Sequence, residues 1–320
     1  MSAVGILHSM RILITGSTGM LGKAIKRELE KSSSSYFVNS PSSQVLDLLN
    51  ISSVRDYLKT GSFDLVIHCA ALVGGIKANM QRPFEYLNTN VRIDSNLMTA
   101  ALEFGVQGFM YMASSCMYPA NTKQPMTENQ ILTGPLEKTN ESYALAKLVG
   151  TKTVESLSAK LNWHSFILSN MYGDDDKYGD ENSHLIAAIV NKVSRAKNQN
   201  LQEVEMWGSG SARREFTYVN DVAKYLVNII PTLASIPTLM NLGSGIDYSI
   251  REYYEFVCEE FEYQGKIIAN LNGPEGVKQK LMDISLAKAH GWTAETNIRS
   301  GIRATIEDFL NKQGVNYGRD

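Results

Sequence analysis

The sequence has few of the residues that build disulfide frameworks and metal centres. Its 320 residues include three cysteines, Cys69, Cys116 and Cys258, which are scattered along the chain. Their odd number and wide spacing fit neither a disulfide framework nor a metal site. We therefore predict no bound metal and a reducing, cytoplasmic setting.

Strong net charge and long apolar runs are also absent. The net charge is −2 at pH 7, which gives no general attraction to nucleic acid or to anionic membranes. No apolar stretch reaches the roughly 18 residues of a membrane span. The first ten residues lack an early basic region, which indicates a loose extension rather than a signal peptide. The hydrophobic content of 43% fits one large core or two joined lobes.

A glycine-rich turn near the N-terminus predicts a dinucleotide site. The segment Arg11-Ile-Leu-Ile-Thr15 has the character of a buried strand, Gly16-Ser17-Thr18-Gly19-Met20-Leu21-Gly22 follows at once, and Lys23 to Lys31 continue with helical periodicity. The first glycine permits a tight turn, the second lets the backbone approach a pyrophosphate, and the third lets the helix pack on the strand. The unpaired N–H groups of the helix N-terminus then face the phosphates.

The end of the second predicted strand lacks an acidic residue. It has the sequence Phe37-Val-Asn39-Ser40, whereas a carboxylate at this point would bind a ribose 2′-hydroxyl and repel a 2′-phosphate. Neutral hydrogen-bonding groups tolerate the phosphate. The sequence therefore favours NADP(H) as the cofactor, although no arginine stands beside these two polar residues.

Strands alternate with helices, which predicts an α/β fold with a parallel, doubly wound Rossmann sheet. After Leu168 the pattern breaks into a polar loop, Gly173–Asn182. We predict a dinucleotide-binding domain at residues 10–168, to which 214–243 return, and a smaller interleaved substrate lobe at 169–213 and 244–320. The predicted strands are 11–15, 36–39, 65–68, 109–114 and 164–168, and the main predicted helices are 83–104, 142–161, 185–196 and 251–263.

A second pattern places carbonyl chemistry beside the dinucleotide site. Tyr143-Ala-Leu-Ala-Lys147 puts a phenol and an ammonium on one helix face, one turn apart. We expect the ammonium to lower the tyrosine pKa from about 10. Such a tyrosine can donate a proton to a carbonyl oxygen as hydride reaches the carbon. Ser114, predicted at a strand end, can hydrogen-bond the same oxygen.

These features resemble the extended short-chain dehydrogenase/reductase superfamily and, within it, the GDP-L-fucose synthase family. The more specific matches run in order from Arg11 to about Leu310. They are His68-Cys-Ala70-Ala71-Leu-Val-Gly-Gly75, Asn88-Thr-Asn90-Val91, Ser114-Ser115-Cys116-Met-Tyr-Pro119, Thr139-Asn-Glu-Ser-Tyr143, Trp207-Gly-Ser-Gly210 and Arg214-Glu-Phe216.

The resemblance implies an NADPH-dependent enzyme that epimerises C3 and C5 of a GDP-4-keto-6-deoxy-hexose and then reduces C4. It implies a catalytic role for Ser114, Tyr143 and Lys147, with Cys116 and His184 as the base and the acid of epimerisation. It implies cofactor contacts from Gly16 to Gly22, Asn39, Ser40, Asp47, Leu48, Ala70, Ala71, Tyr143 and Lys147. It implies substrate contacts from Ser115, Asn170, Lys192, Trp207, Arg214 and Lys280, and a homodimer through the helices 83–104 and 142–161.

The chain departs from the family at Gly173-Asp174-Asp175-Asp176, where relatives have Gly-Pro-His-Asp. Three adjacent carboxylates repel one another, so we expect a mobile, hydrated loop there. Two alternatives stay open. One is a C4 reductase of another GDP-4-keto-sugar, such as a GDP-6-deoxy-heptose. The other is a non-catalytic, NADP-sensing protein on the same fold.

Overall fold

Six parallel strands form the central sheet of the computed structural model, which describes residues 9–32, 36–179, 183–272 and 276–314. The predicted N-terminal extension lies mostly outside the described residues, as do residues 180–182 of the predicted polar loop. The strand order is β2 (Phe37–Asn39), β1 (Arg11–Thr15), β3 (Leu65–His68), β4 (Gly108–Ser114), β5 (Asn162–Leu168) and β9 (Leu239–Leu242).

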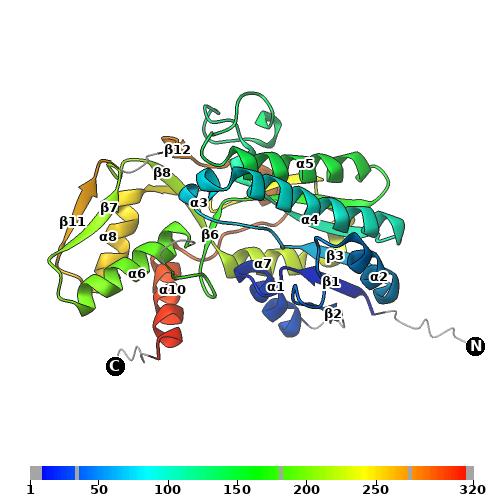
Figure 1. Cartoon of the computed structure of the whole chain (residues 1–320), viewed down its shortest axis with the longest axis horizontal. Helices are drawn as coiled ribbons and strands as arrows, with labels where there is room; N and C mark the ends of the chain where they lie inside the picture. Colours follow the sequence, from blue (N-terminus) through cyan, green and yellow to red (C-terminus); the bar gives the residue numbers. More distant parts are fainter. Residues whose placement is uncertain (1–8, 33–35, 180–182, 273–275, 315–320) are drawn as a thin grey trace, which may run out of the picture.

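Helices cover both faces of this sheet (Figure 1), so the predicted doubly wound α/β fold is confirmed. One face carries α1 (Met20–Lys31) and α7 (Val219–Asn228); the other carries α2 (Ile51–Gly61), α4 (Pro83–Glu103) and α5 (Glu141–Leu157). Alternate residues of β1 explain the two cores, because Ile12 and Ile14 enter one apolar layer while Leu13 enters the other.

A smaller lobe lies to the left of the central sheet in Figure 1. It has its own apolar cluster, which includes Tyr172, Ile189, Phe216, Tyr253 and Phe309. Its strands are β6 (Asn170–Tyr172), β7 (Glu203–Trp207), β8 (Arg213–Tyr218), β10 (Asp247–Ser249), β11 (Lys266–Asn270) and β12 (Gln279–Lys280), and its helices are α6 (Leu185–Asn198), α8 (Ile250–Glu260) and α10 (Ile298–Lys312).

One part of the predicted topology is wrong. Residues 214–218 do not return to the main sheet, because β8 pairs with β6, β10 and β12 in a separate four-stranded sheet. α7 and β9 do return, as predicted. α5 also ends at Leu157 rather than Leu161, where the chain closes in a turn on the Leu157 carbonyl. The division into a dinucleotide-binding domain and a substrate lobe stays a proposal.

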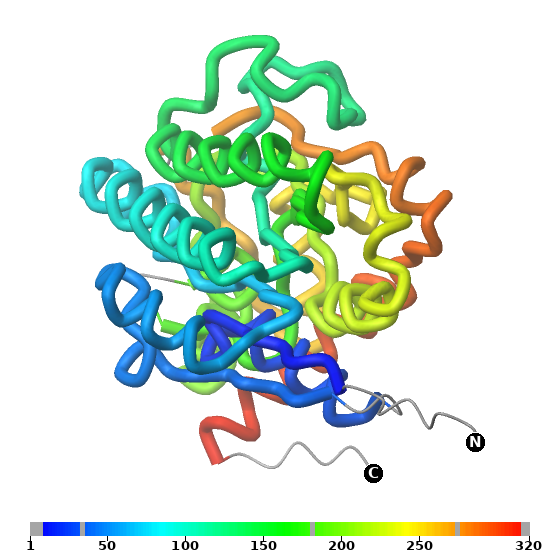
Figure 2. The backbone as a smooth tube through the Cα atoms, turned by 90° about the vertical axis from the view of Figure 1, so that its right-hand side faces the viewer, coloured from blue at the N-terminus to red at the C-terminus, as the bar shows by residue number. Residues whose placement is uncertain are grey.

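Two further short helices are α3 (Ile76–Gln81), which contacts α4, and α9 (Ser285–Ala289), which contacts β9. Between β4 and α5 the chain makes a long excursion, residues 119–140, which Figure 2 shows looping out beyond α5. Met126 ties this excursion to the C-terminal part of the chain, since its N–H donates to the Leu281 carbonyl and its carbonyl accepts from Asp283 N–H, both at 2.8 Å. In the described ranges, no helix is both long and apolar enough to span a membrane.

Candidate active site

The glycine-rich turn joins β1 to α1 with no room for a side chain at Gly16 or Gly22. Gly16 has a φ of +70°, and a Cβ there would lie 2.5 Å from the Ala70 nitrogen. A Cβ on Gly22 would lie 2.3 Å from the Gly16 carbonyl oxygen. Gly19 caps α1 without a side-chain hydrogen bond, so the first N–H groups of this 12-residue helix are not claimed by a cap side chain. This backbone cradle fits the pyrophosphate of a dinucleotide.

The neighbouring strand ends complete the edge of the predicted cofactor site. The Ser17 hydroxyl donates to the carbonyls of Ser40 and Pro41 at 3.0 and 3.1 Å, which holds the residues after β2 beside the turn. Ala70 and Ala71 follow β3 directly. Asp47 is exposed and accepts from the Leu49 N–H at 2.9 Å, while Leu48 is buried. The sequence-predicted cofactor residues therefore come from three consecutive strand ends and the turn before α2.

Ser114 and Cys116 lie at the carboxyl end of β4. The Ser114 hydroxyl accepts from the Cys116 N–H at 3.4 Å, and it caps the short helical turn that carries Ser115 and Cys116. Both Ser115 and Cys116 are buried. Burial raises the pKa of the Cys116 thiol, against the lowering effects of the Ser114 hydrogen bond and of the Lys280 and Lys147 charges. The thiol is therefore protonated before a ligand arrives.

Tyr143 and Lys147 lie in the first turns of α5, and one part of their predicted coupling is wrong. The Lys147 ammonium lies 5.9 Å from the centre of the Tyr143 ring and 4.6 Å from that of Tyr111. Burial is the main cause that raises the pKa of Tyr143 well above 10 instead of lowering it, and the neighbouring Cys116 and Asp94 act in the same direction. Tyr143 is thus a neutral phenol, which suits a proton donor.

A buried polar network beneath Lys147 was not predicted. His68 Nε2 lies 2.9 Å from an Asp94 oxygen, His68 Nδ1 lies 2.6 Å from the Thr15 hydroxyl, and Tyr111 donates to Asp94. Burial lowers the pKa of His68, although Asp94 raises it in part. The available signal was the pair Asn90 and Asp94, two polar residues one turn apart on a helix face that is otherwise apolar.

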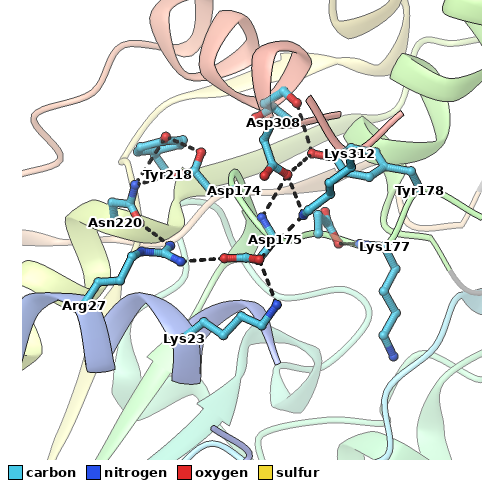
Figure 3. A network of polar contacts seen from close by, with 12 residues as sticks. Lys23, Arg27, Asp174, Asp175, Lys177, Tyr178, Tyr218, Asn220, Asp308 and Lys312 are labelled. Atoms are coloured by element: carbon cyan, nitrogen blue, oxygen red, sulfur yellow. Dashed lines mark hydrogen bonds and ion pairs between the residues drawn. The ribbon is translucent and has the colours of Figure 1, made fainter. Parts of the chain in front are cut away.

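The acidic loop Asp174–Asp176 is held by contacts from both lobes, which corrects the expectation of a mobile, hydrated loop. Asp174 accepts from Tyr218 and Asn220 at 2.9 and 3.0 Å. Asp175 accepts from Lys23 and Arg27 at 2.8 and 2.5 Å (Figure 3). Partners from distant segments therefore neutralise the like charges that the sequence places side by side.

His184 is the N-cap residue of α6, and its ring contacts the Asp176 carboxylate. Nδ1 of His184 lies 2.8 Å from Asp176 Oδ1. Burial lowers the pKa of His184, but the hydrogen bond and the charge of Asp176 outweigh it, so the pKa is raised above its ordinary value. The ring therefore favours the protonated state that an acid needs.

Arg214 and Lys280 approach the Cys116 side of the site from β8 and β12. The two strands pair with Lys280 opposite Arg214. Burial lowers the pKa of Lys280, against the raising effect that a Cys116 thiolate would have. Burial also lowers the pKa of Arg214, which the carboxylate of Glu137 raises in part. Glu137, in the segment 119–140, therefore belongs to the same charged group as Arg214 and Lys280. The sequence did not predict this residue as part of the site.

The remaining sequence-predicted residues lie on the smaller lobe. The Lys192 ammonium lies 5.0 Å from the Trp207 ring centre, and Trp207 is 53% exposed. Asn170 donates to the Glu215 carbonyl at 3.0 Å. Electrostatic interactions thus link Cys116 with Tyr143, Lys147 and Lys280, and Lys280 with Arg214. Ser114 joins this group through its hydrogen bond to the Cys116 N–H. In the described part of the chain, no group of three or more His, Cys, Asp or Glu side chains is arranged to hold a metal.

The chain is similar to known nucleotide-sugar enzymes over almost its whole length. Residues 12–243 match the NAD dependent epimerase/dehydratase family. The chain is 38% identical over 307 residues to the GDP-L-colitose synthase of Yersinia pseudotuberculosis, and the aligned region covers 95% of this chain and 99% of the relative. It is 37% identical over 307 residues to a GDP-L-fucose synthase of Azorhizobium caulinodans, and the aligned region covers 95% of this chain and 98% of that relative.

Among solved structures, the NADP-bound GDP-mannoheptose C4 reductase MlghC of Campylobacter jejuni matches with a TM-score of 0.85 at 26% identity, covering 94% of this chain and 98% of that one. The fold, the glycine cradle and these similarities agree. The chain belongs to the NAD dependent epimerase/dehydratase family and, within it, to the GDP-L-fucose synthase family.

Proposed function

We propose that this enzyme converts GDP-4-keto-6-deoxy-D-mannose to GDP-L-fucose, by epimerisation at C3 and C5 and reduction at C4 with NADPH. The observation that carries the proposal is the group formed by Ser114, Cys116, Tyr143 and Lys147 at the carboxyl end of β4 and the start of α5. It combines a phenol suited to reduction with a thiol that a simple reductase does not need. The similarity to GDP-L-fucose synthases over the whole chain supports it.

Reduction at C4 uses Tyr143 as the proton donor. NADPH, when bound on the glycine cradle, supplies the hydride that reaches C4. Ser114 hydrogen-bonds the C4 oxygen, and the neutral Tyr143 phenol gives that oxygen its proton. The Lys147 ammonium, buried beside the rings of Tyr111 and Tyr143, stabilises the phenolate that Tyr143 becomes.

Epimerisation uses a base and an acid on opposite faces of the sugar ring. The Cys116 thiol first gives up its own proton to solvent, and the resulting thiolate takes the proton from the carbon beside the ketone. His184 then returns a proton to the other face. The ketone oxygen, held by Ser114 and Tyr143, carries the negative charge between the two transfers. Lys280 and Lys147 are the two cations that favour the thiolate.

The GDP moiety needs cations and a groove, and both lie at one side of the site. Arg214 and Lys280 suit a diphosphate, with the guanidinium giving two-point contact. A surface groove of about 800 Å³ runs beside them, between residues 120–138 and 276–279. Glu137 lines this groove and also interacts with Arg214, which links the groove to the cations.

Exchange of carbon-bound hydrogen with deuterated water tests the proposal. With GDP-4-keto-6-deoxy-D-mannose, the wild type should incorporate deuterium at C3 and C5 and give GDP-L-fucose with one NADPH consumed per product. Cys116→Ser should lose most of the exchange, since a hydroxyl is a far weaker base than a thiolate at neutral pH. His184→Gln should permit exchange but stall inversion. Absence of exchange in the wild type would leave the thiol without this role.

The second candidate is a C4 reductase of another GDP-4-keto-sugar. The likeness to a GDP-mannoheptose C4 reductase favours it. NADPH oxidation across a panel of GDP-4-keto-sugars, with the product configuration read by NMR, separates the two activities. An NADP-sensing protein would oxidise no NADPH with any of them, and the Ser114, Tyr143 and Lys147 set argues against that class.

We further propose a cytoplasmic homodimer that associates through α4 and α5. Large apolar side chains are exposed on both helices: Phe84, Leu102, Leu145 and Val149. Light scattering at micromolar concentration should give twice the chain mass of 35.5 kDa. A Val149→Glu variant should shift the equilibrium towards monomer, and a monomeric wild type would exclude the proposal.

A further inference from the structure

The contact between His184 and Asp176 joins an accessible imidazole to a buried carboxylate. The two atoms, Nδ1 and Oδ1, lie 2.8 Å apart. The Asp176 side chain is 1% exposed, whereas the His184 side chain is 43% exposed. With Nδ1 turned to the carboxylate, Nε2 is the ring nitrogen that is left to meet a ligand.

Asp176 has a fixed place because the two residues before it are anchored. Figure 3 shows Asp175 between Lys23 and Arg27 of α1 on one side and Asp308 and Lys312 of α10 on the other. The Asp175 N–H donates to Asp308 at 3.0 Å. The carboxylate of Asp175 is only 15% exposed, so these contacts are less screened by solvent than ordinary surface ion pairs.

Asp176 contacts His184 through one of its two carboxylate oxygens. Its Oδ1 accepts from the Lys177 N–H at 2.8 Å as well as from the imidazole. Its Oδ2 is buried and has no hydrogen-bond partner among the described residues. A buried carboxylate requires compensation, and an imidazolium in direct contact supplies a positive charge. Of the charged neighbours that act on His184, Lys177 opposes this effect.

We propose that Asp176 is the positioning residue of His184: it fixes the Nδ1–H tautomer and holds the ring charged for proton delivery from Nε2. The arrangement matches a general pattern in which a carboxylate orients an imidazole and stabilises its protonated form. The inference rests on the proposed epimerisation, and it assigns a specific task to one carboxylate of the acidic loop.

The variant Asp176→Asn tests the proposal, because it keeps the size of the side chain and removes its charge. In deuterated water, incorporation at C3 and C5 should persist, since Cys116 is unchanged. Formation of the inverted product should fall about tenfold or more, because loss of the carboxylate removes both the orientation of the imidazole and the stabilisation of its protonated form. The matched control is Asp174→Asn, which removes the same charge from the same loop without a contact to His184 and should invert close to the wild-type rate.

NMR titration of the His184 ring supplies a readout that does not require turnover. The wild type should titrate above the ordinary histidine pKa of about 6.5 with a proton on Nδ1, and Asp176→Asn should titrate lower. Wild-type titration at or below 6.5, or unchanged inversion in Asp176→Asn, would overturn the proposal. If the wild type inverts neither carbon, the proposed function fails, and the titration still decides whether Asp176 holds the ring charged.

Discussion

Replacing Gly22 by alanine tests how tightly α1 is seated on the glycine-rich turn. In an ordinary exposed helix this change is stabilising by about 1 kcal/mol, because alanine has the better helix propensity. Here the new Cβ would lie 2.3 Å from the Gly16 carbonyl oxygen and 2.8 Å from the Ser17 Cα, both backbone atoms that cannot rotate away. Overpacking of this kind costs about 1–3 kcal/mol and must displace the helix N-terminus.

We therefore expect Gly22→Ala to lower the free energy of unfolding by about 1–2 kcal/mol and to weaken NADPH binding more than tenfold. Chemical denaturation measures the first effect and NADPH fluorescence titration the second. The control is Gly179→Ala, where a Cβ meets nothing within 4 Å. A Gly22→Ala protein that is as stable as the wild type and binds NADPH equally well would refute the packing argument.

Three further outcomes follow from the site and its surroundings. Tyr143→Phe should lower the rate of C4 reduction by about 10²–10⁴-fold while NADPH still binds, and near-normal NADPH oxidation would contradict its role as proton donor. NADPH should be preferred to NADH in kcat/KM, because Asn39 and Ser40 present no carboxylate to a 2′-phosphate; a preference for NADH would exclude that pocket. Burial raises the pKa of Glu215 to about 7, so the folded protein retains a proton that the unfolded chain releases above pH 4.5. Unfolding free energy should fall by up to about 3 kcal/mol between pH 4.5 and 7, and Glu215→Gln, compared by denaturation, should not show this decrease.

The elements around the glycine-rich turn could be predicted from the sequence because their signals are local. Continuous apolar runs mark β1, β3 and β4, and each is buried between two helical layers. The sheet that contains β8 could not be predicted in this way. Its partners β10 and β12 have only three and two residues, which is too short for a periodic pattern.

Two expectations about the chemistry of the site were wrong. The loop at Asp175 was expected to be mobile because its cationic partners Lys23 and Arg27 lie 152 and 148 residues away along the chain. The pKa of Tyr143 was expected to fall because only the neighbouring lysine was visible in the sequence. Tertiary contacts that no local pattern records decide both cases, because distant cations hold Asp175 and burial raises the pKa of Tyr143.

The late return of β9 to the central sheet has a consequence for synthesis on the ribosome. β9 pairs with β5, yet residues 169–238 separate the two strands. At about 5–20 residues per second, a nascent chain spends roughly 4–14 seconds with the edge of β5 unpaired. The buried Trp292 donates to the Gly243 carbonyl at 2.7 Å, so a still later segment packs against the end of β9. The nucleotide-binding half is therefore not a separable module, and a gene fragment that stops before residue 239 encodes a sheet with an exposed, aggregation-prone edge.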